Sequence, residues 1–355
     1  MTSQITWPYI LGKLIAKQDL NRAEATWSLD QIMAGEATDA VIGAFLMALR
    51  SKGETVDELS GLVDAMLLNA IKLETGQDAL DIVGTGGDML GTVNVSSMAS
   101  VLVASAGIPV LKHGSRSASG KTGSSEMLER LGIKLDLSAE AVAKVFEATG
   151  ITFFFAPVFH PAMMNLAPIR KALGVPTTFN FLGPLANPAQ PIATSLGVAN
   201  PNIAPVMAAE LAARGRSGLV FRGNDGLDEL TTTTESHIWQ VSGGDVTTFT
   251  LNPTNLGLNL SKIENLLGGD PSTNARIASD IFAGKTSGNL GQVRDIVLLN
   301  AAGGVVSYEL AKDPSRADVE LVDRFTSALQ RVTTALDSGR TSAKLDEWIA
   351  ATSAV

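Results

Sequence analysis

The stretch Ala79-Leu80-Asp81-Ile82-Val83-Gly84-Thr85-Gly86-Gly87-Asp88 joins a short apolar run to a glycine-rich turn. Such a run, ending at glycine, is typical of a buried strand that enters a tight turn. The glycines permit positive φ angles and let backbone N–H groups approach an anion closely. Their spacing matches neither the Walker pattern nor the dinucleotide fingerprint, so neither ATP nor NAD is indicated. Alone, the turn fits a plain tight turn as well as a phosphate site.

The chain after this turn alternates between expected helices and strands. We predict helices near residues 96–106, 125–131, 139–148 and 201–213, and strands at 79–83, 108–111, 151–155 and 218–221. This order is typical of an α/β domain with a largely parallel sheet. Residues 236–251 alternate in polarity and predict a hairpin, and helices are expected to close the chain.

The residues before the turn predict a small helical domain. Thr6 and Thr38 are placed to open helices, and Thr55 with Glu58 forms a capping-box pattern ahead of a third apolar face. We therefore expect a helical domain over 1–74 and an α/β domain over 79–355. Residues 161–173 look helical and lead into a turn-rich stretch at 179–188. This segment, near 165–190, is expected to return the chain to the first domain.

Composition narrows the class of protein. A chain of 355 residues with 45% hydrophobic and 18% charged residues is long enough for two folded units and is not of the disordered class. The absence of cysteine excludes disulfides and thiolate chemistry and suits a reducing compartment. The net charge of −9 disfavours nonspecific binding to nucleic acid or anionic membranes. No apolar stretch is long enough to span a bilayer, and we expect a cytoplasmic protein.

Polar residues follow the turn in two further motifs. Asn94-Val95-Ser96-Ser97 stands where the next helix should begin, and its side chains suit a helix cap, a phosphate contact or a metal ligand. Lys112-His113-Gly114-Ser115-Arg116 follows a strand end, where ligands bind in open α/β sheets. Taken alone, the motif slightly favours a solvated basic turn. Residues 117–125 form a serine- and glycine-rich loop that suits closure over a ligand.

Adjacent carboxylates follow a later expected strand. Asp228 and Glu229, together with serine and phosphate oxygens, could supply the all-oxygen shell that magnesium prefers. Taken alone, such a pair is more often a surface feature. His113, His160 and His237 lack the spacing of a zinc site.

The order of these motifs resembles the anthranilate phosphoribosyltransferase family of tryptophan biosynthesis. The resemblance spans nearly the whole chain and includes His160-Pro161-Ala162-Met163, Ala167-Pro168-Ile169-Arg170 and Phe179-Asn180-Phe181-Leu182-Gly183-Pro184. It implies the nucleoside phosphorylase/phosphoribosyltransferase fold: a small helical N-terminal domain plus a large α/β domain with a mostly parallel central sheet flanked by helices. It also implies Mg²⁺-dependent transfer of phosphoribosyl from phosphoribosyl pyrophosphate (PRPP) to the anthranilate amine, and a homodimer formed through the helical domain.

The resemblance also assigns roles to residues of this sequence. Magnesium would bind Ser96, Asp228 and Glu229, and anthranilate would contact Gly84, Ser115 and Arg170. No covalent catalyst or general base is assigned. Ser115 departs from the family pattern, which has asparagine there, and puts the acceptor contact at that position in question. The residues implied to bind PRPP are Gly84, Thr85, Gly86, Gly87, Asp88, Thr92, Asn94, Val95, Ser96, Ser97, Lys112, His113, Gly114, Ser115, Arg116, Ser117, Ala118, Ser119, Gly120 and Ser124.

Two other functions fit parts of the pattern. A pyrimidine nucleoside phosphorylase would explain the phosphate turn but explains Asp228, Glu229 and Arg170 poorly. A non-catalytic relative that binds nucleic acid would be expected to carry a basic face, whereas this chain is acidic and keeps both carboxylates. Anthranilate phosphoribosyl transfer is therefore the favoured function, with PRPP and anthranilate as partners and no nucleic acid or membrane.

Overall fold

A seven-stranded sheet in the order β3-β2-β1-β4-β5-β6-β7 forms the centre of the protein. A computed structural model describes residues 5–73, 75–116 and 122–355. Strands β1 to β5 are parallel, whereas β6 and β7 form an antiparallel hairpin at one edge. The strands are β1 (Leu80–Gly84), β2 (Val110–Gly114), β3 (Ile151–Phe155), β4 (Ala193–Gly197), β5 (Ser217–Gly223), β6 (Ser236–Ser242) and β7 (Asp245–Leu251). The expected mostly parallel sheet and the hairpin are confirmed.

Strand β4 is a finding that the sequence did not predict. Its residues, Ala-Thr-Ser-Leu-Gly, include no run of large apolar side chains, although all five are buried. Small residues suffice there because helices cover both faces of the sheet. β4 pairs with β1 from Leu80↔Ala193 to Gly84↔Gly197. Since β2 and β4 lie on opposite sides of β1, the carboxyl ends of β1 and β4 form a topological switch point, where α/β sheets bind ligands.

Alternate residues of the strands enter two different cores. Leu80, Ile82 and Phe221 face a core built with α5 (Val95–Ser105) and α13 (Leu290–Lys312). Their neighbours in the strands, such as Val83 and Val220, pack with α11 (Ala204–Ala213) and with the helical bundle. This two-sided burial follows from the alternation of side chains along a strand.

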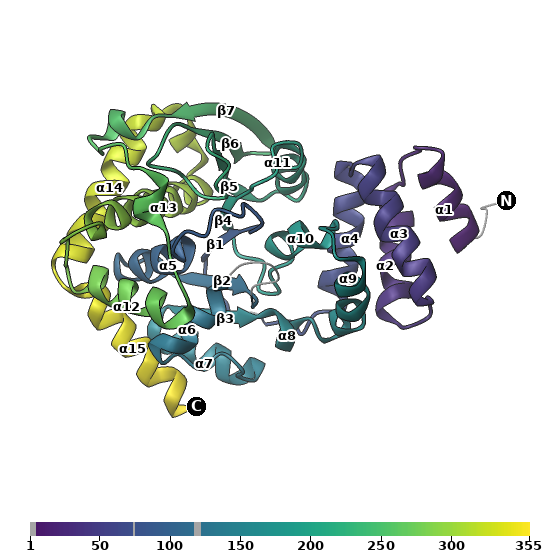
Figure 1. Ribbon diagram of the computed structural model, residues 1–355, viewed down its shortest axis with the longest axis horizontal. Coiled ribbons are helices and arrows are strands. Elements are labelled where there is room, and N and C mark those ends of the chain that lie inside the picture. The colour runs from purple at the N-terminus through teal and green to yellow at the C-terminus, as the bar shows by residue number, and fades with distance from the viewer. Residues whose placement is uncertain (1–4, 74, 117–121) are drawn as a thin grey trace.

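The N-terminal bundle contains α1 (Trp7–Ile15), α2 (Arg22–Met33), α3 (Asp39–Lys52) and α4 (Val56–Leu68). It lies beside the α/β body, at the purple end of the colour scale (Figure 1). The capping box of α4 is confirmed, because Thr55 N donates to Glu58 Oε2 over 2.9 Å and Glu58 N to Thr55 Oγ1 over 3.4 Å. Helix α2 was not predicted, although Asn21 and Glu24 form a capping box at its start.

The segment after β3 returns to the bundle. Residues 161–173, expected to be helical, form the 3₁₀ helix η1 (Pro161–Leu166) and then α9 (Ala167–Leu173). The turn-rich stretch forms α10 (Phe179–Leu182) and η2 (Gly183–Leu185). Leu166, Phe179 and Leu182 share the core of the bundle helices, and α9 and α10 lie between the bundle and the sheet (Figure 1). The division into 1–74 and 79–355 stays a prediction.

Further helices cover the sheet and close the chain. They are α6 (Ser124–Leu131), α7 (Ala139–Thr149), α8 (Ala156–Phe159), α12 (Pro271–Phe282), α14 (Leu321–Asp337) and α15 (Arg340–Ala354), with η3 (Pro253–Leu256), η4 (Ile263–Leu266) and η5 (Pro314–Asp318) between them. In the ranges that the structure describes, no helix has both the length and the apolarity to cross a bilayer.

Candidate active site

The glycine turn after β1 is held against the end of β4 and against Asp228. Thr85 N donates to Gly197 O over 2.9 Å, and Ala199 N donates to Thr85 Oγ1 over 3.2 Å. Gly86 and Gly87 take φ angles of 66° and 82°, a region that favours glycine. Gly86 N donates to Asp228 Oδ2 over 2.6 Å. The turn predicted from the sequence therefore meets a carboxylate 142 residues further along the chain.

Two glycines make room for Asp228. A Cβ atom at Gly84 would overlap Asp228 Oδ2, and one at Gly197 would overlap the backbone oxygen of Asp228. Both glycines end neighbouring parallel strands. The acidic residue can thus lie in the crevice at the switch point only because both strands end in residues without side chains.

Asp228 and Glu229 are destabilised as a pair of anions. Burial, followed by the charge of Asp88, raises the pKa of Asp228 to about 7. Burial, followed by the charge of Asp228, raises the pKa of Glu229 well above its ordinary value. Ser96 N donates to Glu229 Oε1 over 3.1 Å, which places the start of α5 at the pair. A bound cation would relieve this repulsion.

The oxygen atoms around the acid pair fit magnesium better than zinc. Ser96 brings a hydroxyl, and Lys112 Nζ lies 3.4 Å from its Oγ and 2.6 Å from Ile82 O. Across residues 5–73, 75–116 and 122–355, no three His, Asp or Glu side chains gather as a metal site would require. Magnesium commonly uses one or two carboxylates and completes its shell with water and substrate phosphates. Ser96, Asp228 and Glu229 match that donor set.

The start of α5 presents the Asn94–Ser97 motif to the same crevice. Asn94 stands at the N-cap position but makes no side-chain capping bond. Ser97 is buried, and no described group bonds its hydroxyl. Thr92 forms an isolated bridge with Leu267. Capping therefore does not account for the polar side chains of this motif.

The motif after β2 is divided between buried and exposed residues. Lys112 is buried, and burial lowers its pKa. Ser115 is exposed, and its backbone oxygen accepts from Ser124 Oγ over 3.4 Å. Arg116 forms a two-point ion pair with Glu129 over 2.9 and 3.0 Å, so its guanidinium is engaged within the protein. The predicted contacts Ser117, Ala118, Ser119 and Gly120 lie outside the described residues.

Of the residues predicted to bind the acceptor, Gly84 ends β1 and Ser115 follows β2, whereas Arg170 lies on α9 of the segment that returns to the bundle. Arg170 Nη2 donates to Asn180 Oδ1 over 3.3 Å, and burial lowers the pKa of Arg170. His113 Nδ1 lies 2.9 Å from Gly183 O, and the His113 and His160 rings lie 5.2 Å apart. Within the described ranges, no hydrogen bond or ion pair joins Arg170 to the glycine turn or to the acid pair.

Comparisons with known proteins agree with this geometry. Residues 76–342 match the glycosyl transferase family a/b domain, and residues 8–70 match the helical bundle domain of that family. The anthranilate phosphoribosyltransferase of Leifsonia xyli subsp. xyli is 53% identical over 352 residues, covering 99% of this chain and 100% of that protein. The chain belongs to the anthranilate phosphoribosyltransferase family.

Solved structures of the family share the fold. The Thermus thermophilus enzyme superposes with a TM-score of 0.87 at 36% identity, covering 97% of this chain and 99% of that one. The Saccharomyces cerevisiae enzyme in complex with PRPP and Mg gives a TM-score of 0.84 at 26% identity, covering 99% of both chains. The same yeast enzyme has been solved with 4-fluoroanthranilate, at 25% identity and a TM-score of 0.83, covering 99% of this chain and 100% of that one. The predicted family and fold are confirmed.

Several residues of this family member that hold the site were not found from the sequence. Asn300 of α13 is buried, accepts from Leu230 N over 2.9 Å and donates to Leu230 O over 2.8 Å. It thereby fixes the backbone directly after Glu229. Asn187 donates to Asp81 Oδ2 over 2.9 Å and to Leu111 O over 2.8 Å. A single asparagine within a helix or loop gives no sequence signal of its long-range partner.

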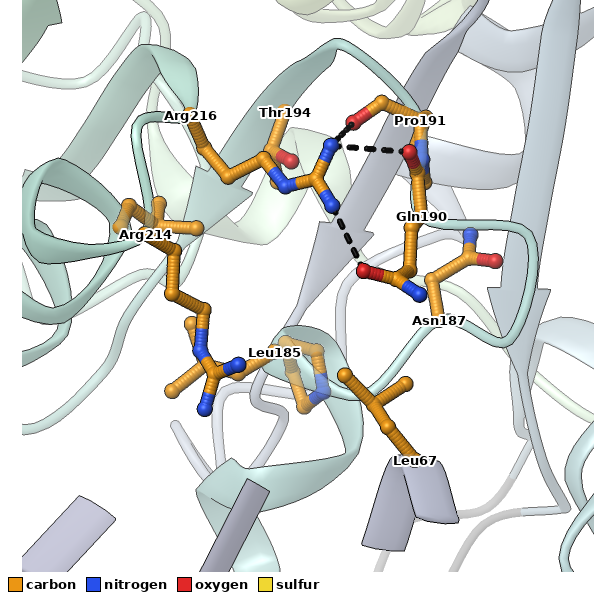
Figure 2. A pocket seen from close by; sticks show the side chains of 10 residues that line it. Leu67, Leu185, Asn187, Gln190, Pro191, Thr194, Arg214 and Arg216 are labelled. Atoms are coloured by element: carbon orange, nitrogen blue, oxygen red, sulfur yellow. Dashed lines mark hydrogen bonds between the residues drawn. The ribbon is translucent and has the colours of Figure 1, made fainter. Parts of the chain in front are cut away.

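A small cavity lies at the opposite end of the sheet in this family member. Its volume is about 30 Å³, enough for one or two water molecules but not for a sugar phosphate. Arg216 donates to Gln190 Oε1 over 2.8 Å and to Gln190 O over 3.0 Å (Figure 2). Arg214 bonds Ser60 O over 2.7 Å. Both arginines that line the cavity therefore already have partners within the protein.

Proposed function

We infer that this chain is an Mg²⁺-dependent anthranilate phosphoribosyltransferase of tryptophan biosynthesis. It would transfer the phosphoribosyl group of PRPP to the amine of anthranilate and release pyrophosphate. The inference depends on one observation: the glycine turn contacts the acid pair, because Gly86 N donates to Asp228 Oδ2 over 2.6 Å. The names of the relatives and the PRPP- and Mg-bound yeast structure support it.

The metal site proposed here consists of Ser96, Asp228 and Glu229. When bound, Mg²⁺ would neutralise the diphosphate and stabilise it as a leaving group. The raised pKa values of both carboxyl groups express the cost, first, of burying each anion and, second, of placing it near other anions. Asp88 adds to that cost, because it repels Asp228. The glycine turn therefore suits a pyrophosphate only together with a counter-charge, which the acid pair would hold in place.

The protein's own groups would bind and orient the donor. Lys112 lies beside Ser96 and brings a positive charge to the diphosphate side of the crevice. In the reaction, the bond between ribose C1 and the diphosphate oxygen breaks, and the oxygen keeps the electron pair. The amine nitrogen forms the new bond to C1 and then loses a proton. Because the attacking amine and the leaving group are both supplied by substrates, positioning can provide most of the acceleration.

The acceptor site proposed here uses Arg170, with Gly84 and Ser115 as neighbours. The planar guanidinium can bind the anthranilate carboxylate through two parallel hydrogen bonds. Asn180 holds Arg170 Nη2 at 3.3 Å and also accepts from Thr177 N at 3.0 Å, so it helps to fix the side chain. Ser115 is exposed and shorter than an asparagine, which leaves space on this side of the acceptor.

Two further properties belong to the proposal. We propose a homodimer through the helical bundle, because α1 and α3 expose Ile15 (75%), Tyr9 (38%) and Met47 (37%). A solution mass of a single chain by light scattering would contradict it. We also propose a cytoplasmic location, since a donor as highly charged as PRPP does not cross a bilayer.

A fluorescence assay tests the proposed function. Mixing the protein with anthranilate, PRPP and Mg²⁺ should consume anthranilate fluorescence, and mixtures lacking PRPP or containing a chelator should not. Calorimetry of PRPP with Mg²⁺ measures donor binding separately. Donor binding without loss of fluorescence would refute the acceptor and leave the donor assignment standing. Phosphorolysis of thymidine or uridine without magnesium would favour the nucleoside phosphorylase alternative instead.

A further inference from the structure

Asn94 makes two hydrogen bonds that leave its amide with only one possible orientation. Its Nδ2 donates to Thr122 O over 3.2 Å, and its Oδ1 accepts from Asn274 Nδ2 over 2.8 Å. Asn274 lies on α12, 180 residues further along the chain, and is 1% exposed. The side chain of Asn94 therefore links the start of α5 to two distant segments.

These contacts belong to a closed ring of four residues. Gly269 N donates to Asn274 Oδ1 over 2.7 Å, and Thr122 Oγ1 donates to Gly269 O over 2.7 Å. Together with the two bonds of Asn94, the ring joins the N-cap of α5, the segment before α6 and the residues before α12. Val93 N and Gly268 N add backbone bonds to Leu266 O (3.0 Å) and Gly91 O (2.9 Å) alongside it.

Two backbone groups of the ring, Gly269 N and Thr122 O, determine how the amides of Asn274 and Asn94 are oriented. Gly269 N can only donate, so the Asn274 carbonyl oxygen must face it and the Asn274 amino group must face Asn94. Asn94 must then present its carbonyl oxygen to Asn274 and its amino group to Thr122 O, which can only accept. The backbone donor and acceptor therefore fix which way both amides point.

We propose that Asn274 is a positioning residue for the donor site. It occupies the carbonyl oxygen of Asn94, so that Asn94 offers an N–H, and not an oxygen, to the anionic donor. The inference rests on the proposed function, because that function makes Asn94 a PRPP contact. An anion is bound well by an amide N–H and repelled by an amide oxygen, so the orientation set by Asn274 affects donor affinity directly.

Asn274→Asp tests the orientation. The new carboxylate can still accept from Gly269 N but has no hydrogen for Asn94 Oδ1. Repulsion between this carboxylate and Asn94 Oδ1 is expected to turn the Asn94 amide over, at the cost of its bond to Thr122 O, so that its oxygen faces the donor. We expect the Kd for PRPP with Mg²⁺, measured by calorimetry without acceptor, to rise roughly tenfold, as for the loss of one hydrogen bond to a charged group. The KM for anthranilate should stay within about twofold.

The Asn94→Ala background separates positioning from a general structural role. If Asn274 acts through Asn94, Asn274→Asp should change the Kd for PRPP less than about twofold in that background. Asn289→Asp is the matched control, because it alters a similar bond, from Nδ2 to Asn265 O at 2.9 Å, that does not involve Asn94. A folded Asn274→Asp protein with wild-type PRPP affinity would overturn the proposal. An equal tenfold loss in the Asn94→Ala background would do the same.

Thr122→Val decides the matter if Asn274→Asp does not fold. It removes only the hydroxyl that bonds Gly269 O and keeps the backbone oxygen that accepts from Asn94. We expect a rise of about threefold in the Kd for PRPP, and no change would refute the ring's role. If the wild-type protein binds no PRPP at all, the proposed function fails and this inference fails with it. PRPP binding without turnover removes only the acceptor assignment and leaves the Asn274 test intact.

Discussion

The donor half and the acceptor half of the candidate site are built in different ways. In the donor half, Gly86 N bonds Asp228 at 2.6 Å and Ser96 N bonds Glu229 at 3.1 Å, joining segments more than a hundred residues apart. In the acceptor half, Arg170 stands on a seven-residue helix, and among the described residues its side chain has one hydrogen bond, of 3.3 Å, to Asn180. The residues proposed to hold the metal and the diphosphate are thus already bonded to one another, whereas the residue proposed to recognise the acceptor is held by few contacts.

The contrast follows from charge. A site for a diphosphate and a cation must hold several like charges close together, which requires fixed backbone donors and buried carboxylates. A site for an aromatic carboxylate needs one guanidinium and an apolar surface. We therefore expect substitutions in the donor half to have larger effects on turnover and stability than comparable substitutions in the acceptor half.

The largest effect is expected from removing the charges of the acid pair. Asp228→Asn combined with Glu229→Gln should lower kcat at fixed Mg²⁺ by roughly a thousandfold, because the leaving diphosphate loses its counter-charge. The free energy of unfolding should stay the same or increase, since two buried, mutually repelling carboxylates become neutral. Steady-state kinetics and urea unfolding measure the two quantities. Turnover within tenfold of wild type would reject the metal role of both residues.

A pair of glycine substitutions compares the two halves directly. Gly197→Ala places a Cβ atom on the backbone of Asp228 and should lower the free energy of unfolding by about 2–3 kcal/mol. Gly183→Ala, in the returning segment, meets nothing within 4 Å and has a helical φ of −51°, so it should be neutral or slightly stabilising. Thermal and urea unfolding of both variants provide the comparison. Equal destabilisation of the two variants would show that the contact between Gly197 and Asp228 does not account for the loss of stability.

The sequence revealed the donor half more completely than the acceptor half, for a physical reason. The residues of the donor half lie in short motifs at strand ends and helix starts, and the parallel strands bring those ends together. These residues are Gly84, Asp88, Ser96, Lys112, Asp228 and Glu229. The direct hydrogen bond from Gly86 N to Asp228 was not predicted, because β4 lies between their strands and its small residues gave no strand signal. Asn274 and Asn300 were missed because each is an isolated asparagine whose partner is distant in sequence.

The fold was predicted in the same uneven way. Strands β1, β2 and β5 were expected because their apolar runs stop at or near glycine, β3 because of its apolar run after a helix, and the capping box of α4 marked a helix start. Residues 161–173 were expected to be helical, and they divide into a 3₁₀ helix and an α-helix at Ala167. Pro168 stands in the first turn of α9 and has no N–H to donate to the preceding turn, so a single α-helix is interrupted there.

A smaller effect is expected at the centre of the acceptor half. Arg170→Lys should raise the KM for anthranilate about tenfold, because an ammonium group cannot form two parallel bonds with a carboxylate. The Kd for PRPP with Mg²⁺ should be unchanged, since no described hydrogen bond joins Arg170 to the donor half. Initial rates at saturating PRPP measure the first quantity and calorimetry measures the second. A weaker Kd for PRPP would mean that the two halves are coupled through this residue.

The smallest effect concerns the junction of the two halves, where His160 Nε2 lies 2.9 Å from Ala186 O. Burial lowers the pKa of His160 from 6.5 to about 4, so the folded protein holds it neutral. Its contribution to stability is therefore fully present above pH 6.5 and is lost as the pH falls toward 4. As the pH falls from 7.5 to 5.5, the free energy of unfolding of the wild type should decrease by about 1 kcal/mol more than that of His160→Gln. Parallel stability curves for the two proteins over that range would show that His160 is not held neutral, and that the junction is open to water.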